Sequence, residues 1–220
     1  MNKIISLLFC LLFLITAGQV QAKNDKDWMN SRYKDALSTM KLKYKLPKGF
    51  IGKDTLECFE SAPQFKGTVT CVESQMYSTD KNFIVYFYIH ENFTAADSAQ
   101  IAKLFPTFKQ YSVENYHVRH IENDLKTSMG DSYIAPVKRH IKYYPNDFVK
   151  KTLNADTLIS YPLTIKRGLY LNDLYKNCKV LLIQKKGRGF IALYCFYNEV
   201  AAKNLDQYMK PVEEMFKYRD

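Results

Sequence analysis

Four histidines are the side chains in this sequence that could act as general bases or metal ligands near neutral pH. His117 and His120 have H-x-x-H spacing, and on a helix they would share a face and could hold a metal together. Their neighbours Tyr116, Val118 and Ile121 favour a strand, on which residues three apart point to opposite faces. Because no H-E-x-x-H occurs either, we expect no metal site.

The sequence lacks the common catalytic and nucleotide-binding motifs. It has no G-x-S-x-G nucleophile elbow, no Walker loop and no G-x-G-x-x-G, and no cysteine stands in a recognisable nucleophile setting. We therefore expect a non-enzymatic protein with no cofactor and no catalytic residue. A hydrolase with a site built from dispersed residues stays open as an alternative, and its general bases would be His90, His117, His120 and His140.

Two stretches alternate basic and apolar residues with the period of a strand. In the first, Lys41, Lys43 and Lys45 alternate with Met40, Leu42, Tyr44 and Leu46, which gives a strand with one buried face and one lysine face. In the second, a predicted strand over 134–144 places Lys138, His140, Lys142 and Tyr144 on one face. Both faces are predicted sites for an anion or a glycan, and the alternative is that they are ordinary solvated strand faces.

Four cysteines follow the N-terminal apolar run, and an even number suggests disulfides in an exported protein. Two β-rich runs, 178–184 and 190–195, surround a glycine-bearing turn, and a two-residue loop at Lys186-Gly187 would place Cys178 opposite Cys195. A turn centred on Gly187-Arg188-Gly189 is the alternative, and it would shift the register and remove this match. A second predicted hairpin has Cys58 and Cys71 on its two strands. We predict the disulfides Cys58–Cys71 and Cys178–Cys195; the alternative is that the thiols stay reduced as small buried hydrophobes.

The first residues have the pattern of a secretory signal peptide. Met1-Asn2-Lys3 is a positive start, 4–16 is apolar, and Val20-Gln21-Ala22 ends the segment with small residues. A membrane anchor is the alternative, but the apolar run is shorter than the ~20 residues that a spanning helix needs. We predict that residues 1–22 are removed and that the protein is exported, to the periplasm or outside the cell, with no transmembrane span.

Composition indicates the kind of partner. The chain of 220 residues carries a net charge of +10, with 47% hydrophobic and 25% charged residues, which is typical of a globular protein. Outside the cytoplasm a basic surface meets anionic lipid head groups and acidic glycans. No nucleic-acid-binding motif is present, so we predict an envelope protein or an anionic envelope component as the partner, and no nucleic acid.

Hydrophobic periodicity predicts the elements that hold these residues. The run 83–89 is apolar on both faces and is typical of a central strand covered on both sides. Further strands are predicted at 68–77 and 111–121, and helices at 94–105, at 145–153 and from an N-cap at Asn198 to Met215, with a kink or division at Pro211. We predict an α/β (α+β) fold, a largely antiparallel sheet covered by helices, in one domain over 39–220 after a polar arm, or short helix, at 23–38.

The two ends of the chain resemble those of PsbP/Mog1-like domains. A strand running into Tyr44-Lys45-Leu46-Pro47-Lys48-Gly49-Phe50 resembles the opening of such domains, and the closing hairpin and helix that end near 215–219 resemble their close. The resemblance implies an α/β/α sandwich and a binding, scaffold or chaperone-like role, with no catalytic residue to carry over. We predict an exported, non-enzymatic binding or accessory protein of the cell envelope; a secreted hydrolase or a structural subunit of an envelope assembly are the alternatives.

Overall fold

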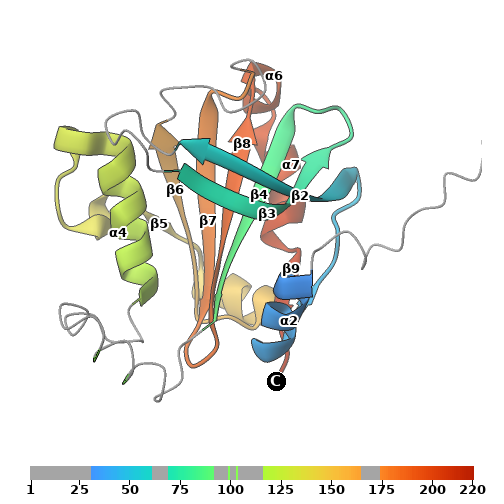
Figure 1. The fold of residues 1–220 in the computed structure, drawn as a ribbon, viewed down its shortest axis with the longest axis vertical. Helices are drawn as coiled ribbons and strands as arrows, with labels where there is room; N and C mark the ends of the chain where they lie inside the picture. The colour runs from blue at the N-terminus through green and yellow to red at the C-terminus, as the bar shows by residue number, and fades with distance from the viewer. Residues whose placement is uncertain (1–30, 61–68, 92–98, 100–102, 104–115, 165–173) are drawn as a thin grey trace, which may run out of the picture.

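A seven-stranded antiparallel sheet runs through the middle of the molecule, in the order β2-β3-β4-β8-β7-β6-β5 (Figure 1). The structure, a computed structural model, describes residues 31–60, 69–91, 99, 103, 116–164 and 174–220. The strands of the sheet are β2 (Phe50–Glu60), β3 (Val69–Ser78), β4 (Phe83–Glu91), β5 (Lys142–Tyr143), β6 (Thr157–Thr164), β7 (Asn177–Lys185) and β8 (Gly189–Tyr197). The antiparallel α+β fold predicted from the sequence is confirmed.

Helices lie on both faces of the sheet. They are α2 (Ser31–Thr39), α4 (Tyr116–Met129), the single turn α5 (Asn146–Phe148) that continues into the π-helical turn η5 (Val149–Leu153), α6 (Glu199–Ala202) and α7 (Leu205–Glu213). Two 3-10 turns, η3 (Gly130–Ser132) and η4 (Val137–Arg139), follow α4. Figure 1 shows α4 on one side of the long strands and α2 and α7 on the other.

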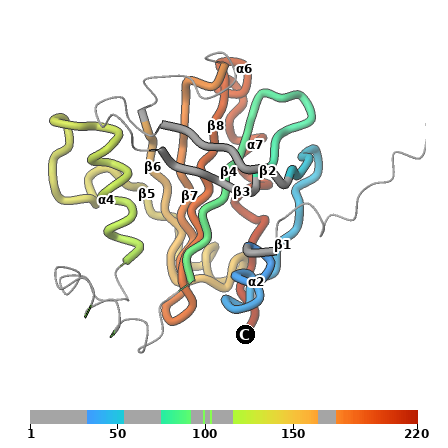
Figure 2. The backbone as a smooth tube through the Cα atoms, viewed as in Figure 1, coloured from blue at the N-terminus to red at the C-terminus, as the bar shows by residue number. Residues whose placement is uncertain are grey.

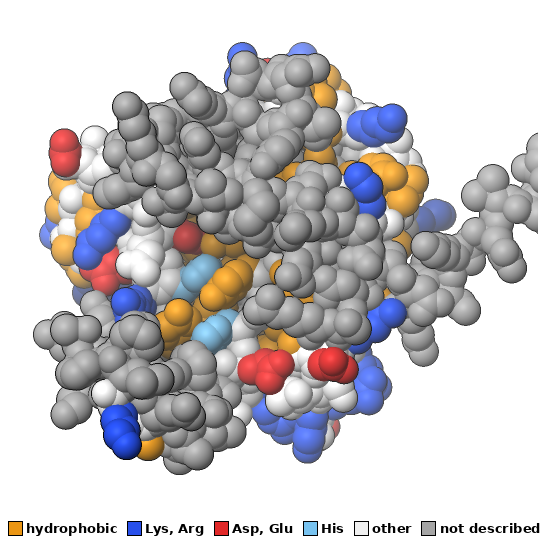
Figure 3. Space-filling view, in the orientation of Figure 1, with side chains coloured by type: hydrophobic (Ala, Val, Ile, Leu, Met, Phe, Trp, Pro, Cys, Tyr) orange, Lys and Arg blue, Asp and Glu red, His pale blue; other side chains and the backbone are white. Residues whose placement is uncertain are grey.

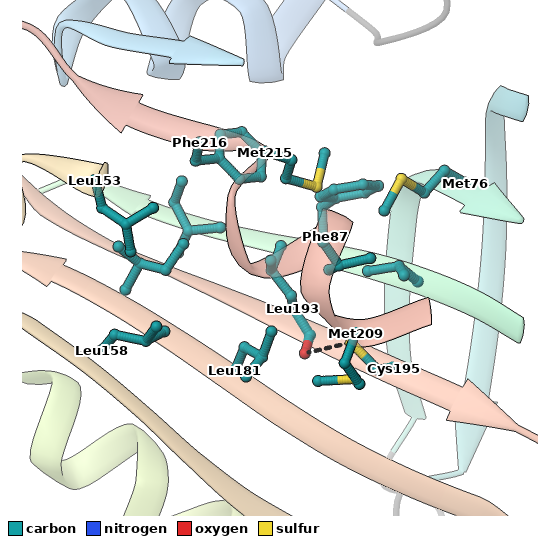
Figure 4. Close-up of a cluster of buried hydrophobic side chains, with 14 of the residues drawn as sticks. Met76, Phe87, Leu153, Leu158, Leu181, Leu193, Cys195, Met209, Met215 and Phe216 are labelled. Carbon is teal, nitrogen blue, oxygen red and sulfur yellow. Dashed lines mark hydrogen bonds between the residues drawn. The ribbon is translucent and has the colours of Figure 1, made fainter. Parts of the chain in front are cut away.

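Alternate residues of the central strands fill two separate cores, as expected for strands that are apolar on both faces. Phe87 of β4 and Leu193 of β8 belong to the core beneath α2 and α7 (Figure 4). Tyr86 and Tyr194, one position away on the same strands, belong to the core beneath α4, together with Ile121 of that helix. The apolar run at 83–89 is therefore the central strand that the sequence predicted.

A small second sheet joins the two ends of the described chain. β1 (Leu42–Tyr44) pairs antiparallel with β9 (Phe216–Tyr218), and Figure 2 shows the α2–β1 segment beside the C-terminal end. Leu42, Phe216 and Tyr218 are buried in the core beneath α2 and α7, so the other side of this ribbon faces solvent. The described part of the predicted N-terminal arm is thus a packed helix, α2, whose Leu37 is 4% exposed.

Two predicted strands are wrong. Residues 116–121 begin the helix α4, because Ile121, Leu125 and Ser128 repeat at helical spacing and are buried against the sheet. The predicted strand over 134–144 contains the 3-10 turn η4, and within it only the two residues of β5 form a strand. The predicted helix at 94–105 lies outside the described residues, apart from 99 and 103.

The hairpin between β7 and β8 has a three-residue loop and not the two-residue loop predicted. Lys185 pairs with Gly189, and the positive φ of Gly187 (75°), a conformation open to glycine, forms the turn. Every pair therefore shifts by one residue, so Cys178 lies opposite Phe196 and Cys195 opposite Lys179. The two thiols are on opposite faces of the sheet and are not joined, so the predicted Cys178–Cys195 disulfide is wrong.

Other local predictions agree with the structure. The Asn198 side chain accepts hydrogen bonds from the backbone N–H groups of Val200 and Ala201, which makes it the predicted N-cap. Asn154 ends η5 in the left-handed conformation (φ 49°). The backbones of Cys58 and Cys71 are directly opposite in β2 and β3, but their side chains lie outside the description, so that disulfide stays a prediction. Within the described part of the chain, no helix is long and apolar enough to cross a membrane.

Candidate functional site

The solvent side of the β1–β9 pair carries five basic residues, which we call the basic ribbon. Leu42 and Tyr44 point toward the core, so the alternating residues Lys41, Lys43 and Lys45 are exposed, as the sequence predicted. The opposite strand contributes two more exposed residues with the same alternation. The basic ribbon consists of Lys41, Lys43, Lys45, Lys217 and Arg219.

Like charges face each other across this ribbon. Lys43 is the direct register partner of Lys217, and the Arg219 N–H donates to the Lys41 carbonyl at 2.7 Å, which places these two residues opposite each other as well. Like charges placed directly opposite each other on a strand pair oppose folding. The arrangement therefore concentrates positive charge at some cost to stability.

No carboxylate offsets this charge among the described residues. The ion pairs there join His120 with Asp124, Lys126 with Glu122, and Lys150 with Asp156, and none of the five ribbon residues has a carboxylate oxygen within 4.0 Å. Other basic residues at the same end of the molecule do have structural roles. Lys185 Nζ donates to the Asn154 carbonyl at 2.6 Å, and Arg188 Nη1 donates to the Met40 carbonyl at 3.4 Å.

The ribbon borders a hollow of about 740 Å³ between β1 and α2. Lys34 and Ser38 of α2 line it, together with Lys41, Lys43 and Arg219. Its one acidic lining residue among those described, Asp220, accepts a hydrogen bond from Asn154 Nδ2 at 2.8 Å. Lys and Arg side chains gather in the lower right of Figure 3, beside acidic ones, where Figure 1 places α2 and β9. The hollow gives an anionic group several cations to approach at once.

The second predicted basic face does not exist as one surface. His140 Nε2 lies 2.7 Å from the Ile134 carbonyl oxygen, within the turn that follows η4. The Tyr144 hydroxyl donates to Glu213 at 2.5 Å and its ring packs against the core beneath α2 and α7. Lys138 lines a pocket beside α4, and Lys142 is exposed in β5. Lys142 Nζ lies 5.8 Å from the centroid of the Tyr144 ring, so these two side chains are adjacent. Because the segment is not a continuous strand, Lys138 and His140 do not continue the same face.

The pocket beside α4, which we call the α4 pocket, has a volume of about 490 Å³. It is enclosed by α4, by the segment from Tyr133 to Tyr143, and by β6. Most of its lining is apolar, through Val118, Ile121, Val137, Ile141, Tyr143 and Ile159. His117, Glu122 and Lys138 are its ionisable lining residues besides the tyrosines.

Histidines also lie in a closed polar network between α4 and the sheet. The Tyr161 and Tyr194 hydroxyls donate to Asp124 Oδ2 at 2.7 and 2.9 Å, and His120 Nε2 lies 2.9 Å from the Tyr194 hydroxyl. The His120 ring stacks on Tyr88 with centroids 4.7 Å apart. Figure 3 shows histidine side chains among hydrophobic ones on this side of the molecule.

Burial keeps these histidines neutral. Burial lowers the pKa of His120, although the nearby Asp124 opposes the shift. Burial, together with the charge of His120, lowers the pKa of His90 to about 4. His90 stacks on Tyr116 of α4 with centroids 4.3 Å apart. The His120 nitrogen that a general base would present to a substrate is thus engaged with Tyr194, and the network joins α4 to the sheet.

Sequence reasoning found the first half of the basic ribbon and missed the second. Lys217 and Arg219 also alternate with apolar residues, Phe216 and Tyr218, but the segment follows directly on a strong helical pattern. The period-two signal there is only four residues long, which made it easy to read as the end of the helix. The two histidines of the H-x-x-H sequence lie in different surroundings: His117 lines the α4 pocket, whereas His120 contacts the Tyr194 hydroxyl.

Comparison with known proteins gives one structural match of note. No family model matches the sequence, and no curated protein matches it. The structure is similar to the solution structure of cyanobacterial PsbP (CyanoP) from Synechocystis sp. PCC 6803, with 11% identity, a TM-score of 0.41, and coverage of 82% of this chain and 88% of that chain. This is the type of domain that the ends of the sequence resemble. A TM-score at this level supports no inference about function or about particular residues.

Proposed function

We propose that this chain is an exported, non-enzymatic binding protein that attaches to an anionic component of the cell envelope through the basic ribbon. The observation that carries the proposal is the cross-strand pair Lys43–Lys217, flanked by Lys41 and Arg219, with no carboxylate within 4.0 Å among the described residues. Repelling cations held on a rigid, packed ribbon are the arrangement that a multivalent anion would stabilise.

Two features of the molecule support this reading. The ribbon strands are anchored by Leu42, Phe216 and Tyr218 in the core, so the backbone that carries the cations is already ordered before a ligand binds. The hollow beside the ribbon adds Lys34 to the cations that a bound anion can approach. The predicted signal peptide would deliver this surface to the compartment in which anionic head groups and acidic glycans are found.

The test is binding of the mature chain, from Lys23, to vesicles of equal parts phosphatidylcholine and phosphatidylglycerol, measured by co-sedimentation at low and at physiological salt. A soluble acidic polysaccharide forms a second arm that separates a glycan from a lipid head group. Each lysine near an anionic surface contributes about 1 kcal/mol, so the double variant Lys43→Gln/Lys217→Gln should bind about thirtyfold more weakly. Binding to both probes should fall as salt rises.

The matched control is Lys176→Gln/Lys203→Gln. It removes the same charge from exposed lysines at the end of the molecule where β7 begins, away from the ribbon. If the two double variants lose the same affinity, the protein responds only to net charge and the ribbon is not the site. Absence of wild-type binding to both probes at low salt would also contradict the proposal.

A further inference from the structure

We propose that the α4 pocket is a second binding site, which takes a single-chain anionic amphiphile such as a fatty acid. Its acyl chain would lie in the apolar interior and its carboxylate would meet Lys138. This site is separate from the basic ribbon: the two have no lining residue in common.

The interior of the pocket suits an alkyl chain. Its floor includes Ile121 and Ile159, which are 2% and 1% exposed, and its walls include Val137 and Ile141. A volume of about 490 Å³ lies within the range of ordinary small-molecule sites, which are mostly apolar with a few polar groups that fix orientation. A ligand that filled this space with a chain would remove apolar surface from water on both sides.

The mouth of the pocket is unusually apolar for an exposed surface. Tyr143, at the edge of the sheet, is 62% exposed, and Val118 on α4 is 40% exposed; both line the pocket. Ile134 is 60% exposed and lies in the segment that forms one wall. The hydrogen bond between His140 Nε2 and the Ile134 carbonyl holds that wall in place. The apolar surface thus runs from the floor to the rim, as a chain longer than the pocket would need.

The charges at the mouth decide which end of a ligand stays outside. Lys138 is exposed and has no carboxylate within 4.0 Å among the described residues. The acidic lining residue, Glu122, is already paired with Lys126 at 2.8 Å. Arg139 and Lys142, which follow Lys138 along the chain, are exposed and also basic. An anionic head group therefore complements the rim, whereas a cationic one does not.

The experiment is isothermal titration calorimetry of the mature chain with decanoate, below its critical micelle concentration, and with 1-decanol as the uncharged ligand of equal chain length. Val118→Trp places a bulky ring in the pocket wall and should weaken decanoate binding about tenfold or more. Lys138→Gln should weaken decanoate binding about threefold to fivefold and leave 1-decanol binding unchanged, since an exposed ion pair contributes little.

The controls separate this site from a general surface effect and from the ribbon. Val200→Trp changes another exposed helical valine, 58% exposed on α6, and should bind decanoate as the wild type does. Lys43→Gln/Lys217→Gln should also retain decanoate binding, whatever it does to binding of vesicles. Ala135→Phe in the exposed wall is a second filling variant if Val118→Trp proves unstable.

Three results would overturn the proposal. The first is absence of decanoate binding by the wild type, the outcome expected if the pocket receives a side chain of a partner protein. The second is equal weakening by Val118→Trp and Val200→Trp. The third is loss of decanoate binding in Lys43→Gln/Lys217→Gln, which would place the ligand on the basic ribbon.

Discussion

The basic ribbon and the polar network beneath α4 use ionisable residues in opposite ways. In the network, Asp124 accepts from Tyr161 and Tyr194, and His120 contacts Tyr194, so each group is used within the protein. In the ribbon, Lys43 faces Lys217, and no carboxylate oxygen of the described residues lies within 4.0 Å of a ribbon cation. Histidines and carboxylates, the residues that suggest chemistry in a sequence, thus have a structural role here, whereas lysines on a plain strand face are the groups left available for a ligand.

The largest effect expected from this contrast is on stability, at Asp124. Asp124→Ala would leave two buried tyrosine hydroxyls without their acceptor, and each such loss costs about 1–3 kcal/mol. We expect the free energy of unfolding, measured in urea, to fall by about 2–6 kcal/mol. Asn123→Ala, at the neighbouring exposed position of α4, should change it by less than about 0.5 kcal/mol. Equal effects would mean that the network does not hold α4 to the sheet.

A second effect should appear as a pH dependence of stability. Burial lowers the pKa of His90 from 6.5 to about 4, and lowers that of His120. Between pH 4 and pH 6.5 the unfolded chain binds protons that the folded chain does not. The free energy of unfolding must therefore fall as the pH drops from about 6.5 toward 4. Thermal unfolding measured across this window should show the loss.

The variant His90→Phe sharpens the pH experiment. Phenylalanine keeps an aromatic ring next to Tyr116 but cannot titrate, so part of the loss between pH 6.5 and pH 4 should disappear. His140→Gln is the control, because His140 lies in the turn after η4 and not in the network. An unchanged pH profile in His90→Phe would show that this histidine is not what limits stability in acid.

In the ribbon, replacing a charged residue should raise stability, whereas the Asp124 substitution in the network lowers it. Lys43→Glu would turn a repulsive cross-strand pair with Lys217 into an attractive one, which stabilises by about 0.2–1 kcal/mol. The same variant should lose affinity for anionic vesicles. Lys203→Glu makes an identical change in net charge, and it should neither stabilise the protein nor lower its affinity for anionic vesicles. A Lys43→Glu protein that is less stable than the wild type and still binds anionic vesicles would contradict the contrast drawn between the ribbon and the network.

The smallest expected effect concerns the two buried thiols, one on each face of the sheet. Burial raises the pKa of both Cys178 and Cys195, so neither should react with a thiol reagent in the folded protein. Peptide mapping without reductant should find them unlinked and find Cys58 joined to Cys71. A Cys178–Cys195 link would contradict the register of the β7–β8 hairpin.

The contrast also explains what the sequence could and could not predict. The apolar run of β4 and the cap at Asn198 depend on neighbours in the chain, and both were predicted correctly. The register of β7 and β8 was missed by one residue because it depends on the length of the loop, which has three residues, and Gly187 fits a loop of either length. A strand was predicted for residues 116–121, the start of α4, because Tyr116 and Val118 favour strands, whereas the contacts of Ile121 and Leu125 with the sheet stabilise the helix.

The candidate site was half predictable for the same reason. The lysine face at 41–45 follows from local alternation, and it is exposed as expected. Its pairing with 216–218 joins the two ends of the described chain, and nothing local in the sequence indicates such a partner. The single face predicted to carry Lys138 and Lys142 is not formed, because the prediction extended a strand across residues that form a 3-10 turn.

The central claim is that the ribbon binds a multivalent anion that has no alkyl chain, whereas the α4 pocket does not. The most direct test is an NMR titration of the ¹⁵N-labelled mature chain with inorganic polyphosphate. We predict that backbone amide shifts concentrate at 41–45 and at 217–219, and that the amides of α4 stay in place. Shifts centred on α4, or spread evenly over all exposed lysines, would contradict the account.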